Sequence, residues 1–227
     1  MSDSRLTPQA GDSRPGPKIG EAVASGRPKA DRSRLPDVGP APHFRFPAIE
    51  KSSLPNGLRV WTVRQPALPI ATLTLLMRRG AAMDPAGKEG LAALTLDMLD
   101  EGSGGRSSIE MHEELARLGT RLDSDIGSAA PMLSITALSR VSERALVIMA
   151  DMAVRPSLTE KDFDRVRQLR LHRLKQLRDV ASAVADRAFV RLLYGSHPYG
   201  HTPLGSEAAL TASSVEDVRA FHRAHVR

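Results

Sequence analysis

The sequence contains no cysteine and few aromatic residues. Without cysteine the chain can form no disulfide, no thiolate metal site and no cysteine nucleophile. Aromatic residues make up 4% of the chain and hydrophobic residues 41%, so a core must be built mainly from aliphatic side chains and methionine. These absences exclude several kinds of site but leave the cellular compartment open.

Long apolar runs are also missing. No stretch approaches the ~20 apolar residues that a membrane-spanning helix needs, and we expect no membrane partner. The charged N-terminus is followed by no apolar run of the kind that secretory signals carry. We therefore expect a cytoplasmic location for the chain as given, while a periplasmic one stays open.

Positive charge is in excess, with 32 lysine and arginine residues against 26 aspartate and glutamate residues. A nucleic-acid surface needs such cations in one patch. The densest basic run, "RVRQLRLHRLKQLR" at residues 165–178, places its cations on all sides of a helix. No recognition motif accompanies it, so we predict a solvated helix and no nucleic-acid partner.

Composition divides the chain near residue 43. Residues 1–43 contain no aromatic side chain and are rich in proline, glycine, serine and arginine. Such a segment buries too little apolar surface to offset its ordering entropy. We predict a disordered extension over residues 1–43 and a folded domain over residues 44–227.

The domain begins with strand signals and ends with helix signals. "LPNG" is a turn before the β-rich "LRVWTV", and "ATLTLLMRRG" predicts a second strand. "TRLDSDIGSAAPMLSITAL" alternates like a hairpin, and Ser107 or Ser108 is a suitable N-cap for a helix that ends at Gly119. Further helices are predicted at residues 90–99, 142–154 and 160–177, and in "ADRAFVRLLYG" and "SVEDVRAFHRAHV". This order predicts an α+β fold with helices on one face of a largely antiparallel sheet.

Four segments stand in an order that is known from one family: "LPNGLRV", "DPAGKEGLAALTLDMLDEGS", "HPYGHTPLGS" and "SVEDVRAFHRAHV". The chain resembles the N-terminal domain of the pitrilysin/insulinase-type metallopeptidases. Those enzymes carry an inverted zinc motif, H-x-x-E-H, in a helix that begins with Gly-Leu-Ala. The resemblance also implies that this chain ends before the last strands of the domain.

The zinc motif of the family has lost its chemistry in this sequence. Its two histidines fall on Ala93 and Asp97, and its glutamate base falls on Leu96. The third ligand, a glutamate of a later helix, falls on Arg173, with a possible shift of one residue or one turn. Alanine and leucine can neither ligate zinc nor accept a proton from its water. A single aspartate is no zinc site, so we expect no cofactor, although the family implies zinc.

The resemblance therefore implies a non-catalytic peptidase homologue. Such a pseudopeptidase subunit would bind or scaffold a peptide or unfolded polypeptide beside a catalytic, zinc-bearing homologous subunit. Two alternatives stay open. One is a purely structural subunit of a larger assembly. The other is a zinc endopeptidase with unorthodox ligands: Asp97, Asp100, Glu101 and a loop histidine.

Two pairs of histidines are further candidates for ligands. His197 and His201 lie in a Pro/Gly loop, and His222 and His225 lie in the last predicted helix. A metal site usually needs three protein ligands or more. We predict that these four histidines are structural or solvated.

The changed positions also predict a new contact. One side of the helix carries Ala93, Leu96, Asp97 and Asp100, opposite a core face formed by Leu91, Leu94 and Met98. In the long helix Arg170 and Arg173 interrupt an apolar stripe, and a cation that points inward is costly unless it is paired. We expect Asp97 to form an ion pair with Arg173, or with Arg170 one turn earlier, where the family binds zinc.

Overall fold

The computed structural model describes residue 33, residues 39–41, residue 43 and residues 45–226. Most of the predicted extension lies outside the described residues. The chain forms two units, residues 1–48 and residues 49–227, and every helix and strand below belongs to the second unit. Within the described part, no helix is both long and apolar enough to cross a bilayer.

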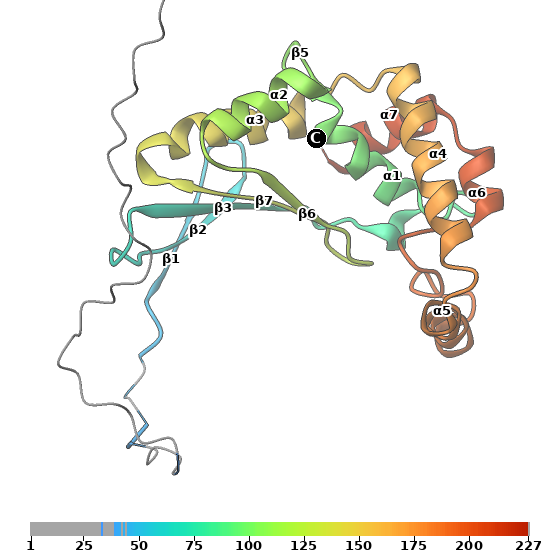
Figure 1. The fold of residues 1–227 in the computed structure, drawn as a ribbon, viewed down its shortest axis with the longest axis horizontal. Helices are drawn as coiled ribbons and strands as arrows, with labels where there is room; N and C mark the ends of the chain where they lie inside the picture. The colour runs from blue at the N-terminus through green and yellow to red at the C-terminus, as the bar shows by residue number, and fades with distance from the viewer. Residues whose placement is uncertain (1–32, 34–38, 42, 44, 227) are drawn as a thin grey trace, which may run out of the picture. The chain divides into compact units, whose positions relative to one another are not determined.

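The second unit contains three antiparallel sheets and seven α-helices among its described residues (Figure 1). The strands β1 and β2 pair with each other, β3, β7 and β6 pair in that order, and β4 and β5 form a short hairpin. In chain order the elements are β1 (Ile49–Ser53), β2 (Arg59–Val63), β3 (Ile70–Leu76), α1 (Leu91–Asp97), β4 (Gly102–Ser103), β5 (Arg106–Ser107), α2 (Ser108–Arg117), β6 (Leu122–Asp125), β7 (Met132–Leu138), α3 (Ser142–Val154), α4 (Glu160–Gln176), α5 (Ala181–Tyr194), α6 (Glu207–Ala212) and α7 (Val215–His225).

The predicted α+β class is confirmed, and local sequence signals account for many boundaries. Ser107 is the N-cap of α2: its hydroxyl accepts from the backbone N–H of Glu110, whose carboxylate accepts from the Ser107 N–H in return. Gly119, just beyond this helix, has a φ of 69°, the left-handed conformation that glycine adopts freely. The predicted hairpin is formed by β6 and β7.

The strand β1, the hairpin β4–β5 and the helix α6 were not predicted. The polar segment "IEKSS" of β1 has little β-propensity of its own and becomes a strand because the "LPNG" turn folds it onto β2. The strands β4 and β5 have two residues each, and α6 has six. Elements this short are below the length at which a hydrophobic period can be recognised.

The core consists of two apolar clusters, and α1 lies between them. In the first cluster α2 and α3 cover one face of the sheet β3–β7–β6, where alternate residues of β7 point inward. This cluster also takes up Leu96 and Leu99 from the α1 region. The second cluster joins α1 to the later helices through Leu91, Leu94 and Met98, and its other members include Phe163, Val166, Leu174, Leu210 and Phe221.

The side of α1 opposite Leu91, Leu94 and Met98 is therefore a second core face. Ala93 and Leu96 are 0% and 4% exposed. The sequence pattern suggested one core face, because it gives no sign that the sheet supplies a second cluster on the other side. Enclosure of α1 on both sides is the main constraint on the candidate site.

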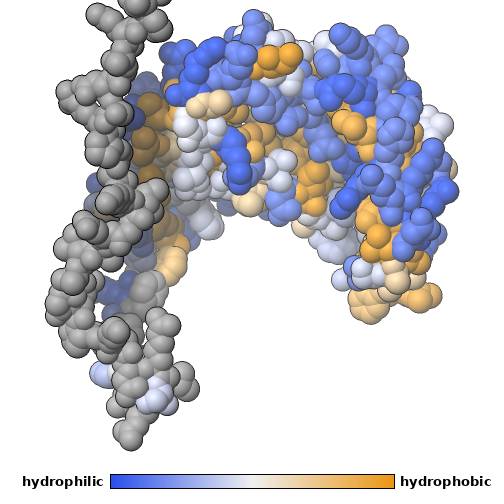
Figure 2. Space-filling view, in the orientation of Figure 1, coloured by the Kyte–Doolittle hydropathy of each residue, from blue (hydrophilic) through white to orange (hydrophobic). Residues whose placement is uncertain are grey.

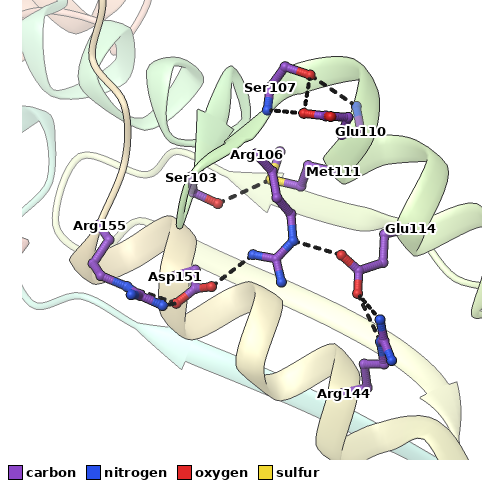
Figure 3. A network of polar contacts seen from close by, with 9 residues as sticks. All are labelled: Ser103, Arg106, Ser107, Glu110, Met111, Glu114, Arg144, Asp151 and Arg155. Atoms are coloured by element: carbon purple, nitrogen blue, oxygen red, sulfur yellow. Dashed lines mark hydrogen bonds and ion pairs between the residues drawn. The ribbon is translucent and has the colours of Figure 1, made fainter.

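A network of charged side chains joins β5, α2 and α3 (Figure 3). Arg106 donates from Nε to Glu114 at 2.7 Å and from Nη1 to Asp151 at 2.9 Å. Asp151 also accepts from Arg155, and Glu114 from Arg144. The hydrogen bonds from Arg155 and Arg106 hold the pKa of the buried Asp151 carboxyl below its ordinary value. The network fixes the β4–β5 hairpin against α3. This hairpin follows directly on the α1 region.

Replacement of the central arginine tests this network. Arg106→Met should lower the free energy of unfolding by about 1–3 kcal/mol, because it leaves two largely buried carboxylates with fewer partners. Arg117→Met is the matched control: its i,i+4 pair with Glu113 is mostly exposed, and its loss should change stability by less than ~0.5 kcal/mol. Chemical denaturation of both variants provides the measurement, and equal effects would contradict the structural role of Arg106.

Candidate functional site

The start of α1 is capped from a distance by Asp84. Its carboxylate accepts from the backbone N–H groups of Gly90 and Ala92, each at 2.7 Å. Its side chain is fully buried. Burial raises the pKa of this carboxyl, and the two backbone N–H bonds and His201 oppose that shift. Asp84 thus takes the place of an N-cap side chain, since Gly90 has none.

His201 ties the loop at residues 195–206 to the same carboxylate. Its Nε2 lies 3.1 Å from Asp84 Oδ2 and 3.0 Å from the Ala81 carbonyl oxygen. Because both of these atoms accept hydrogen bonds, Nε2 carries the proton. The "HPYGH" segment is therefore held against the start of α1 by a structural histidine.

Two glycines allow the loop to approach α1. Gly90 has a φ of 102° and Gly205 a φ of 80°. A Cβ on Gly90 would lie 2.9 Å from the Cα of Gly205, and a Cβ on Gly205 would overlap the Glu89 carbonyl oxygen. Both positions need glycine for space as well as for backbone conformation.

The structure brings Asp97 to Arg170 and not to Arg173. Nη1 of Arg170 is 2.5 Å from Oδ2 of Asp97, and Nη2 donates to the Pro203 carbonyl oxygen at 2.9 Å. The Arg170 side chain is 11% exposed and the Asp97 side chain 32%. Arg173 is exposed, and within the described part of the chain its side chain has no hydrogen bond or ion pair.

Acidic residues continue beyond Asp97. The Glu101 carboxylate pairs with Arg165. Burial, and then the neighbouring Glu101 and Asp97 charges, raise the pKa of the Asp100 carboxyl to about 6, while the positive charge of His112 acts in the opposite direction. Asp100 therefore changes its charge close to neutral pH.

These residues do not fit a zinc ion. Among the described residues, no three or more histidine, aspartate or glutamate side chains are grouped so that they could hold a metal. Asp97 and Glu101 are engaged by arginines, and His201 is bound to Asp84. The unorthodox ligand set of Asp97, Asp100, Glu101 and a loop histidine does not assemble.

The remaining candidate histidines make structural contacts. His222 Nε2 is 2.8 Å from the Ala153 carbonyl oxygen, inside the core. The ring of His225 packs edge-on against Phe221 at 4.5 Å between centroids, and burial lowers its pKa. His197 Nδ1 accepts from the backbone N–H of Tyr199.

A second candidate site is a pocket of about 580 Å³ beside α2. Its charged lining residues include Arg106, Glu114 and Arg144, which already satisfy one another in the network of Figure 3. The pocket leaves few free charges to recognise a ligand, so we assign it a structural role.

Comparison with known proteins identifies the family. Residues 59–207 match the sequence profile described as insulinase (peptidase family M16). The chain belongs to the M16 family. The predicted resemblance to insulinase-type and pitrilysin-type peptidases is confirmed.

Relatives with curated descriptions are remote in sequence and longer than this M16 chain. A probable mitochondrial-processing peptidase subunit beta of Schizosaccharomyces pombe is 23% identical over 80% of the chain, which covers 40% of that protein. An uncharacterized zinc protease of Rickettsia felis is 23% identical over 77% of the chain and 42% of its own length. The M16 chain thus spans about two fifths of the length of these relatives.

Solved structures show the same fold. An inactive M16 peptidase domain from Pseudomonas fluorescens superimposes with a TM-score of 0.73 at 25% identity, over 77% of the M16 chain and 43% of that structure. Pitrilysin superimposes with a TM-score of 0.69 at 19% identity, over 79% and 20% respectively.

Asp84 was missed by sequence reasoning. It lies seven positions before Leu91, the first residue of α1, whereas a recognisable N-cap directly precedes its helix. A 3-10 turn at Ala81–Met83 and the loop after it bring Asp84 back to the start of α1. No short-range motif encodes such a contact.

The close approach at Gly205 predicts a large effect of a single methyl group. Gly205→Ala should destabilise the M16 chain by more than about 2 kcal/mol, because the left-handed conformation and the overlap with Glu89 both oppose the Cβ. Gly57→Ala is the control: its φ of 86° is similar, but no atom lies within 4 Å of its Cβ position. Thermal unfolding of both variants should therefore separate strain from overlap. Equal losses would contradict the packing of the loop on α1.

The raised pKa of Asp100 predicts a pH-dependent effect. Because the folded pKa of about 6 lies above the ordinary 3.8, the stabilising contribution of the bound proton is present below pH ~4 and lost as the pH rises through 6. Asp100→Asn removes this loss, so it should stabilise the chain at pH 7.5, on the order of 1 kcal/mol after discounting for solvent access. At pH 4 it should have little effect. Urea denaturation at the two pH values provides the test, and a difference that does not vary with pH would contradict it.

Proposed function

We propose that this M16 chain is a non-catalytic subunit that holds a peptide or unfolded polypeptide beside a zinc-bearing homologous subunit. The observation that carries this proposal is that the side chains at the positions where the family binds zinc cannot hold the ion. Ala93 and Leu96 offer no ligating atom and are enclosed in the core. Asp97 is already paired with Arg170.

A polarised water cannot be generated by these side chains. Peptide hydrolysis in a zinc peptidase requires ligands that fix the ion and a carboxylate that takes the proton from its water. Here the position of that carboxylate is Leu96, whose side chain belongs to the sheet-side cluster. The chemistry would have to be supplied by another subunit.

The exposed apolar surface of α5 supports the proposal that the chain binds a partner subunit. None of the residues of α5 is buried. Phe189 and Leu192 are 63% and 85% exposed, and Figure 2 shows hydrophobic side chains at the lower right, where Figure 1 places this helix. Exposed apolar patches of this kind often mark protein–protein contacts. One relative is itself described as a subunit of a processing peptidase.

The partner role can be tested by co-expression with an M16 homologue that retains H-x-x-E-H. The two chains should co-purify, and the peptide hydrolysis rate of the homologue should rise in the complex. Leu192→Asp should weaken co-purification by roughly tenfold or more, since it places a charge in an apolar contact. Ile109→Asp on α2 is the matched control, because Ile109 is an equally apolar and 73% exposed residue on a different helix.

The outcomes distinguish the proposed role from its two alternatives. A complex without any gain in hydrolysis would favour a purely structural subunit. Stoichiometric zinc together with peptide hydrolysis by the purified chain alone would overturn the proposal. The variant that carries Ala93→His, Leu96→Glu and Asp97→His should remain inactive, because Arg170 still points a cation at the rebuilt position.

A further inference from the structure

Arg170 lies where three segments of the chain meet. It projects from α4, pairs with Asp97 at the end of α1, and donates to the carbonyl oxygen of Pro203 in the loop at residues 195–206. We infer that position 170 is the structural counterpart of the family's third zinc ligand, and that the Arg170 guanidinium now holds these segments together in place of the metal. This inference rests on the family and on the contacts of Arg170; it does not require the proposed partner role.

The packing of α4 separates position 170 from position 173. The buried residues of α4 are Phe163, Val166 and Leu174. Arg170 follows Val166 by four residues and precedes Leu174 by four, so it shares their face. Arg173 lies about 60° away around the helix and is exposed. A ligand on α4 that is to reach Asp97 must therefore come from position 170.

The chemistry of the pair explains why an arginine suits this place. A metal ion is a cation that binds several lone pairs from different segments at once. A planar guanidinium also carries a positive charge and directs donors toward separate acceptors, here a carboxylate on α1 and a carbonyl on the loop. The Arg170 side chain is largely buried on the face that it shares with Val166 and Leu174, and its charge meets Asp97. Its buried Nε has no partner among the described residues, so Nη1 and Nη2 make the cross-link.

A second contact, between His201 and Asp84, also ties the loop at residues 195–206 to this region. His201 binds Asp84, which caps the start of α1, and the carbonyl oxygen of Pro203 accepts from Arg170, whose other Nη atom pairs with Asp97 at the end of α1. The contacts of His201 and Pro203 hold residues 201–203 of the loop against the α1 region. Without the Arg170 contact, only the His201 end of this short stretch would keep its polar tie to the α1 region.

The first experiment tests the holding role in the full chain. Arg170→Met keeps much of the apolar stem and removes the charge. Hydrogen exchange of backbone amides at residues 201–206 should become at least about tenfold faster, and Tm should fall by roughly 5 °C or more. Arg173→Met is the control and should change neither quantity. If Arg170→Met leaves both exchange and Tm unchanged, the holding role is overturned.

The second experiment tests the positional equivalence by restoring a metal site. The variant with Ala93→His, Asp97→His and Arg170→Glu should bind about one zinc ion per chain, since two histidines at i and i+4 and a carboxylate from α4 would converge. The matched variant carries Arg173→Glu instead of Arg170→Glu and should bind zinc at least about tenfold more weakly. Zinc titration, with the visible spectrum of the cobalt form as a signature of tetrahedral ligation, gives the readout. Equal or tighter binding by the Arg173→Glu variant would overturn the assignment of position 170.

Discussion

The enclosure of α1 between two apolar clusters is the constraint on which the rest of the structure depends. Leu96 and Leu99 enter the cluster between the sheet and the helices α2 and α3, while Leu91, Leu94 and Met98 enter the cluster formed with the later helices. A helix of seven residues would not persist alone in water. The two clusters hold it, and it in turn connects them, so that the sheet layer and the later helices form one core.

This enclosure explains where polar groups are found around α1. Its sides are apolar except for Thr95, whose buried hydroxyl has no hydrogen-bond partner among the described residues. The charged partners described above meet α1 at its ends. Asp84 binds the first turn through backbone N–H groups, and Arg170 reaches Asp97 at the last residue of the helix. Burial of an unpaired charge along the sides would be costly, whereas both ends can be satisfied by residues from other segments.

Local sequence signals predicted the elements well where the signal lies within a few residues. The N-cap serine before α2, the glycine after α2 and the alternation of the β6–β7 hairpin are of this kind. The start of α4 has a signal of the same kind in Thr159, whose side chain accepts from the backbone N–H of Asp162. These features depend on the immediate chain and need no knowledge of tertiary packing.

The candidate site was only partly accessible from sequence because its contacts are long-range. The pattern gave Arg170 and Arg173 as neighbours on one stripe, and only the packing of α4 on α1 decides which arginine faces Asp97. The second core face behind Ala93 and Leu96 depends on how the sheet sits under α1. The role of Asp84 depends on a turn that brings it back to Gly90. None of these is encoded in a spacing.

The changed zinc positions also connect stability with function. An active M16 site must hold three polar ligands and a base near a helix whose surroundings are apolar, and such groups oppose burial unless a metal satisfies them. Once Ala93 and Leu96 replace two of these groups, the helix can be enclosed on both sides without that cost. The remaining acidic position, Asp97, is satisfied by a single cation from α4. The apolar side chains at positions 93 and 96 therefore allow the core to close on both sides of α1, where polar ligands would carry a burial cost.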